Sequence, residues 1–149
     1  MTLKSVFLAA LTALALPVAK GHAETHVYSE NAGFAINGYD TVTYFTHGDP
    51  QRGNPDFAVM WKGVTWLFVS DRNRESFESN PRAYAPQFGG YCSYAVSNGY
   101  LMKSDPLSWE IVDGQLYLTF SPDIHDMWVD EHVEHIERGR GNWPAVLDE

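Results

Sequence analysis

Cysteine is almost absent from this chain, since Cys92 is the only one among 149 residues. A single thiol excludes an internal disulfide, and the absence of a Cys-x-x-Cys pair excludes thioredoxin-like exchange between two thiols. Stability must therefore come from a packed core. Five Trp, eight Tyr and eight Phe residues supply the apolar surface for one.

Basic residues are also scarce, with 10 Lys and Arg against 19 Asp and Glu and a formal net charge of −9. Nucleic acids and anionic membranes attract basic surfaces, so we expect neither as a partner. The chain contains no Gly-x-Ser-x-Gly, phosphate-loop or His-Glu-x-x-His motif. Hydrolase, nucleotide-dependent and common metalloprotease chemistry are therefore not indicated, and a binding module is favoured over an enzyme.

No apolar run is long enough to span a membrane, which takes about 20 residues. The longest, Ser5–Ala19, has 15 mostly apolar residues and follows Lys4. Gly21 and Ala23 then place small residues where a signal peptidase cleaves. The sequence predicts a signal peptide over residues 1–23, with export to the periplasm or the medium and no membrane association after cleavage before Glu24.

Removing residues 1–23 from the 149 leaves 126, the size of one ordinary domain over 24–149. The removed segment holds two of the ten basic residues and no acid, so the mature chain has a net charge of −11. Such an acidic surface is compatible with a metal ion or a protein as partner.

Two β-hairpins are the clearest local structures in the sequence. In each, aromatic and β-branched residues flank a two-residue turn that ends in glycine. The first hairpin pairs Asp56–Trp61 with Val64–Val69, and the second pairs Trp109–Val112 with Gln115–Phe120.

Helix caps mark three further elements. Ser70 or Asp71 caps a helix that contains Phe77, and Pro81 begins another after Asn80. Ser121 caps a final helix that is predicted to run towards Arg138 and to end at Gly139 and Gly141. The periodicity of Thr41–Phe45 does not decide between helix and strand. Hairpins and short helices together predict a small single domain of the α+β class.

The segment around Cys92 has two readings. As a strand, it would bring Cys92, Tyr94 and Val96 to one face. As a short helix, it would follow Gly89-Gly90, end at Asn98-Gly99 and hold Cys92 in its first turn. The helix is favoured.

Several motifs give the mature chain a resemblance to the exported YHS-domain (seleno)protein family. They are Asn37-Gly-Tyr-Asp40, Trp61–Phe68, Asn80-Pro81, Tyr84-Ala-Pro86, Gly89-Gly-Tyr-Cys92, Asp105-Pro106, Asp113–Leu118 and Asn142-Trp-Pro144. The resemblance implies a treble-clef-like YHS core. Compact members of the family bind metal through cysteines at positions occupied here by Gly38–Asp40, Val69 and Asn73. Without thiolates, that site is expected to bind no zinc or copper(I).

Cys92 is the main candidate for chemistry, because the resemblance places selenocysteine at this position in some members. That implies a redox or soft-metal role, and for a soft metal we expect copper as cofactor and Met102 as a second soft ligand. The alternatives are a one-cysteine redox protein that cycles through sulfenic acid, or a partner-binding domain in which Cys92 is only packed.

Four other residues are weaker candidates. His132 and His135 stand three apart on the predicted final helix, a spacing that can hold a borderline metal, although His132 is also placed to pack. Asp40 and Asp105 belong to the motifs above. Each is interpreted first as a turn or cap residue, and only second as an oxygen ligand or base.

Overall fold

The computed structural model describes residues 27–30 and 33–148. The predicted signal peptide, 1–23, lies outside the described residues. Within those residues, no helix is both long enough and apolar enough to cross a membrane. Mixed short strands and helices confirm the α+β prediction. The treble-clef character of the core stays a prediction.

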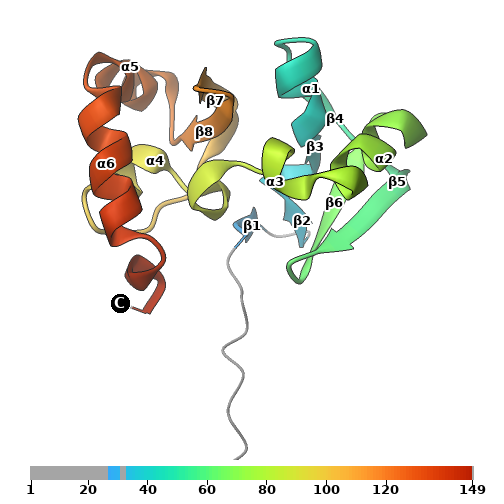
Figure 1. Cartoon of the computed structure of the whole chain (residues 1–149), viewed down its shortest axis with the longest axis horizontal. Helices are drawn as coiled ribbons and strands as arrows, with labels where there is room; N and C mark the ends of the chain where they lie inside the picture. The colour runs from blue at the N-terminus through green and yellow to red at the C-terminus, as the bar shows by residue number, and fades with distance from the viewer. Residues whose placement is uncertain (1–26, 31–32, 149) are drawn as a thin grey trace, which may run out of the picture.

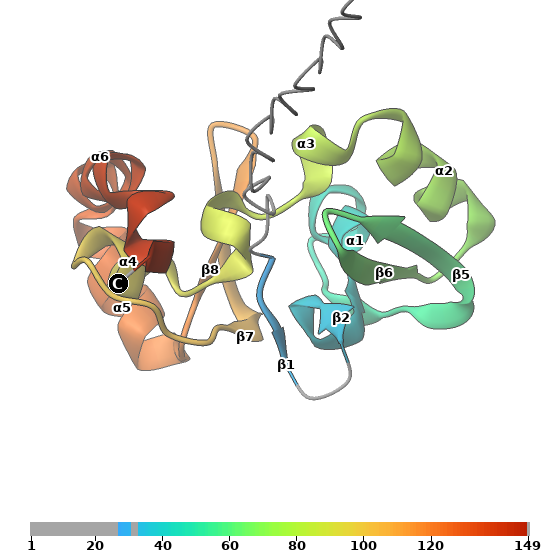
Figure 2. The same cartoon turned by 90° about the horizontal axis from the view of Figure 1, so that it is seen from below.

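The chain folds into two adjoining lobes that face each other across α3 and β1 (Figures 1 and 2). The elements of the first lobe are β1 (Ser29–Glu30), β2 (Phe34–Ala35), β3 (Tyr39–Asp40), α1 (Thr41–Thr46), β4 (Gln51–Arg52), β5 (Asn54–Trp61), β6 (Val64–Phe68), α2 (Asp71–Ser79) and α3 (Pro81–Tyr84). Those of the second are α4 (Ser93–Ser97), β7 (Asp105–Val112), β8 (Gln115–Thr119), α5 (Pro122–Asp130) and α6 (His132–Asn142). A short 3-10 helix spans Ala145–Asp148, whereas Ile36–Gly38 and Gln87–Gly90 are turns in which residues 36–38 and 88–90 have positive φ.

The first lobe contains a four-stranded sheet in the order β1-β2-β6-β5, in which only β2 and β6 are parallel. β3 and β4 form a separate antiparallel pair, and β7 and β8 form the hairpin of the second lobe. Both predicted hairpins are confirmed. Lys62 and Gly63 have φ of 49° and 76°, and Asp113 and Gly114 have φ of 50° and 73°, as type I′ turns require.

Aromatic rings form the centre of the first lobe. Phe77 of α2 stacks on Trp66 at 4.9 Å between ring centroids and contacts Phe68 at 5.1 Å and Trp61 at 5.6 Å. Ser70 caps α2 by accepting the Asn73 N–H at 3.2 Å, as the sequence predicts. This half of the chain is therefore held together by apolar packing between a hairpin and a helix.

Strand β8 joins the two lobes. Leu116 and Leu118 pack into the core of the first lobe, whereas Tyr117 faces the second core with Phe88 and Trp128. Side chains alternate across a strand, so one short strand contributes to both cores. The two lobes are therefore parts of one domain.

The predicted final helix is wrong in one respect, because two helices replace it. Glu131 has φ −129° and ψ 34°, which ends α5 and starts α6. The break redirects the chain: α5 packs against the β7–β8 hairpin, and α6 packs against α4. One straight helix would leave one of these surfaces uncovered.

The predicted end of that helix is also wrong, because α6 continues through Gly139 and Gly141 to Asn142. Gly139 is needed for close packing rather than for termination. A Cβ atom there would lie 2.6 Å from Cζ of the buried Phe88 ring. Around Gly141 there is open space within 4 Å.

These two glycines provide a matched test of the packing between α6 and Phe88. Gly139→Ala is expected to lower the free energy of unfolding by about 1–3 kcal/mol, because the buried ring must move. Gly141→Ala is expected to raise it by about 0.5–1 kcal/mol, because alanine favours a helix at an uncrowded position. Urea unfolding of both variants measures the difference. Equal effects would show that Phe88 does not pack closely on α6.

Candidate functional site

Cys92 is the N-cap residue of α4, which confirms the helical interpretation, except that Cys92 directly precedes the first turn and does not lie within it. Gly99 follows the helix with φ of 83°. The Cys92 N–H donates to the Met102 carbonyl at 3.0 Å, and Cys92 also forms an isolated parallel bridge with Leu118. These backbone contacts fix Cys92 between the helix and β8, where it is only 1% exposed.

Burial controls the protonation of the Cys92 thiol. Loss of hydration raises its pKa above the ordinary value, although backbone N–H groups of Ala95, Phe120 and Tyr94 face the sulfur and act in the opposite direction. The Cys92 side chain forms no capping hydrogen bond with the N–H groups of Tyr94 and Ala95. Desolvation outweighs the three dipoles, so the free protein carries a neutral thiol at pH 7.

The thiol borders a cavity of about 350 Å³ in the second lobe, next to the start of α5. Met102 lines the same cavity, so the structure brings together the two soft ligands named from the sequence. The half-exposed side chains of Tyr100 and Phe120 form part of its wall. Cys92 is therefore buried from bulk solvent but adjoins a space large enough for a small ligand.

The sequence-based interpretation did not identify Phe120 and Tyr100 as neighbours of Cys92. Phe120 directly follows β8, and Tyr100 follows α4, so their proximity arises from the tertiary pairing of these two segments. No local pattern in the sequence indicates that these two segments are neighbours in the fold.

The two candidate histidines are not assembled into a metal site. Nδ1 of His132 lies 2.9 Å from the Val129 carbonyl oxygen, and Nδ1 of the buried His135 lies 2.7 Å from Oγ of Ser97. The His135 ring also packs on Tyr94 at 4.9 Å. Burial and the nearby Arg138 lower the pKa of His135, which keeps it neutral. In the described part of the chain, no three His, Cys, Asp or Glu side chains cluster as metal ligands.

Asp40 lies in the first lobe and is fully buried. Its carboxylate caps α1 by accepting the Val42 N–H at 2.8 Å. The same carboxylate accepts the Val69 N–H at 2.9 Å and Nδ2 of Asn73 at 2.7 Å. The positions of the metal ligands that the YHS resemblance implies to be lost thus lie together, joined by the hydrogen bonds that Val69 and Asn73 donate to the Asp40 carboxylate.

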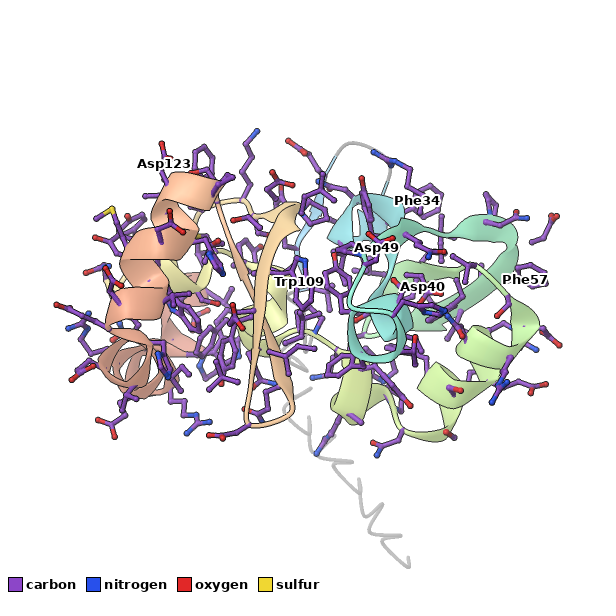
Figure 3. All side chains as sticks on the ribbon, turned by 90° about the horizontal axis from the view of Figure 1, so that it is seen from above. Phe34, Asp40, Asp49, Phe57, Trp109 and Asp123 are labelled. Carbon is purple, nitrogen blue, oxygen red and sulfur yellow. The ribbon has the colours of Figure 1, made fainter. Side chains whose placement is uncertain are left out.

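Asp105 has a local role. Its carboxylate accepts the Leu107 N–H at 2.9 Å at the start of β7, which is an Asx turn as the sequence predicts. Figure 3 shows Asp40 in one lobe and Asp123, which lines the Cys92 cavity, at the start of α5 in the other. The buried carboxylate network and the Cys92 cavity are therefore separate sites.

Comparison with family models, curated proteins and solved structures finds no match. The resemblance to the exported YHS-domain family therefore stays a prediction.

Proposed function

We propose that this chain is an exported binding domain of the YHS type that takes up copper(I) through the Cys92 thiolate, with the Met102 thioether as second ligand. The observation that carries the proposal is that both sulfur-bearing residues line one cavity. Thiolate and thioether are the ligands that copper(I) prefers. The hydrogen bond between the backbones of the two residues fixes their separation.

The soft sulfur ligands, and not the charge of the cavity, favour copper(I), because the Asp123 carboxylate also lines this cavity and could offset the extra charge of a divalent ion. Copper(I) replaces the thiol proton, so the resulting metal–thiolate pair is neutral. The three N–H groups that face the sulfur stabilise its thiolate form once the proton has been displaced.

The raised pKa argues against the alternative of a redox thiol. Oxidation and alkylation proceed through the thiolate, and reactive cysteines therefore have depressed pKa values. Cys92 has the opposite shift. We expect slow alkylation of the folded protein and no accumulation of sulfenic acid under dilute peroxide.

Anaerobic titration with copper(I), in competition with a chromophoric chelator, tests the proposal. Wild-type protein is expected to bind one ion with micromolar affinity or better. Cys92→Ser is expected to weaken binding by at least about 100-fold, since the hydroxyl is a hard ligand. Serine is a preferred N-cap residue and the N–H groups of Tyr94 and Ala95 face this position, so the variant should fold.

A pair of methionine substitutions tests the second ligand, one at Met102 in the cavity and a control at Met60 outside it. Met102→Leu keeps the side-chain volume, removes the thioether and is expected to weaken binding about tenfold. Met60→Leu makes the same change at a residue that is 68% exposed outside the cavity, and it should have no effect. Identical affinities of wild type and Cys92→Ser would contradict the proposal and leave the partner-binding interpretation.

Binding should also depend on pH in a defined direction. Because the thiol pKa lies above its ordinary value, the free protein is protonated at pH 6–8 and each copper(I) ion releases one proton. The apparent affinity is therefore expected to rise about tenfold per pH unit in this range. Titrations at three pH values measure this slope, and an affinity independent of pH would exclude the thiol as ligand.

A further inference from the structure

A second cavity, of about 420 Å³, lies where the two lobes meet and does not include Cys92. It is bordered by the turn of the β5–β6 hairpin, the segment after α3, and the end of α6 with Trp143. Its volume is within the range of cavities that hold small organic molecules, about 300–1,000 Å³.

The interior of this cavity is aromatic. Trp66 and Phe88 are buried at 1% and 5% exposure, and Trp61 and Trp143 are half-buried. Three of the five tryptophans in the chain therefore line one space. Flat apolar groups pack favourably against such rings, by stacking or edge-to-face contact.

The cavity is also lined by cations. Lys62, Arg82 and Arg140 line it, and no Asp or Glu is found among its lining residues in the described part of the chain. All three side chains are exposed, and within residues 27–30 and 33–148 none lies within ion-pair distance of a carboxylate. The mature chain has only eight basic residues and a net charge of −11. Three of those eight basic residues line one cavity, so the cavity is positively charged although the protein as a whole is negatively charged.

Neighbouring groups orient two of these cations. Nη2 of Arg140 lies 3.3 Å from Oε1 of Gln115, which also accepts the Tyr117 hydroxyl. Nζ of Lys62 lies over the Trp61 ring at 5.1 Å from its centroid. The positive groups are therefore held beside the aromatic surface, with donors left for an anion.

We propose that this cavity binds a small organic anion that has a planar apolar body and one carboxylate, sulfonate or phosphate group. The body packs among Trp61, Trp66 and Trp143. The anionic group is bound by Lys62, Arg82 and Arg140, the arginines offering paired N–H donors. Cations without a carboxylate partner, placed beside an aromatic surface, favour an anionic ligand over a neutral aromatic of the same shape, because only the anionic ligand forms charge-assisted hydrogen bonds with them.

Two fluorescent probes with the same body test the requirement for both features. 1-Anilinonaphthalene-8-sulfonate carries an anionic group, and N-phenyl-1-naphthylamine is its uncharged analogue. The wild-type protein is expected to bind the sulfonate at one site, with quenching of tryptophan emission, and at least about tenfold more tightly than the amine. Raising the salt concentration should weaken binding of the sulfonate only.

Charge-removing variants locate the site. Lys62→Asn removes one cation and keeps the hairpin, since Asn-Gly is the preferred sequence of a type I′ turn. Combined with Arg140→Gln, it is expected to weaken sulfonate binding about tenfold or more and to leave the amine unaffected. Arg72→Gln removes one charge from the exposed face of α2, outside the cavity, and should change neither probe.

Equal affinity for the two probes, or an unaltered affinity in the double variant, would overturn the proposal. It would also be overturned if emission rose only when the near-UV circular dichroism was lost, because that indicates binding to a loosened core. Cys92→Ser is expected to bind the sulfonate like the wild type. The anion site and the copper(I) site can therefore fail independently.

Discussion

Asp40→Ala is expected to lower the free energy of unfolding by about 3–5 kcal/mol, the largest loss that we expect from a single side chain in this protein. The carboxylate is fully buried and accepts hydrogen bonds from Val42, Val69 and Asn73. Truncation leaves three N–H donors without an acceptor, two of them buried and that of Val69 part-buried, and it removes the cap of α1. Urea unfolding followed by tryptophan fluorescence measures the loss.

Two variants separate the network from a general effect of removing acids. Asn73→Ala removes one of the three donors and leaves Asp40 with two, so a loss of about 1–2 kcal/mol is expected. Asp105→Ala removes only the Asx turn at Leu107 and should cost about 1 kcal/mol. If Asp40→Ala cost no more than Asp105→Ala, the buried network would not contribute to stability.

The same network leads us to expect that no metal ion stabilises the first lobe. Its polar groups satisfy one another, and its neighbours Trp66, Phe68 and Phe77 pack without any thiolate. A structural metal contributes its binding free energy directly to folding, so removing one lowers the melting temperature. Chelators are therefore expected to leave the thermal stability of the wild type unchanged.

Local patterns in the sequence are sufficient to predict the two hairpins and α2. Gly63 and Gly114 adopt positive φ without strain, Asp113 is among the few other residue types enriched there, and Ser70 supplies the capping oxygen. Each of these features depends on residues adjacent in the chain. The sequence therefore predicts them without knowledge of the tertiary structure.

Features that depend on distant segments could not be predicted in the same way. The local sequence indicates a helix terminator at Gly139. Its packing role depends on contact with Phe88, which lies 51 positions earlier in the chain, so no local pattern indicates it. The cations of the second cavity come from three separate segments and share no motif. For Cys92 the sequence indicated the residue, and only the packing determined its burial and the direction of its pKa shift.

Gly53→Ala is the second large effect that we expect, a loss of about 3 kcal/mol in the free energy of unfolding. Gly53 lies between β4 and β5, where its N–H donates to the Gly38 carbonyl at 2.8 Å. A Cβ atom there would lie 2.6 Å from the backbone oxygen of Leu67 in β6. Backbone cannot move aside as a flexible side chain can, so β4 would have to separate from β6.

This close approach also positions Asp40. β4 pairs with β3, in which Asp40 lies opposite Gln51, and the Asp40 carboxylate reaches Val69 just beyond β6. Separating the strands should therefore weaken the same hydrogen bonds that Asp40→Ala removes.

In a double-mutant cycle, Gly53→Ala combined with Asp40→Ala is expected to cost at least about 1 kcal/mol less than the sum of the single losses. The pair of Gly53→Ala with Gly139→Ala, in the other lobe, should be additive and serves as the control. Strict additivity in both cycles would show that the glycine and the buried carboxylate stabilise the first lobe independently.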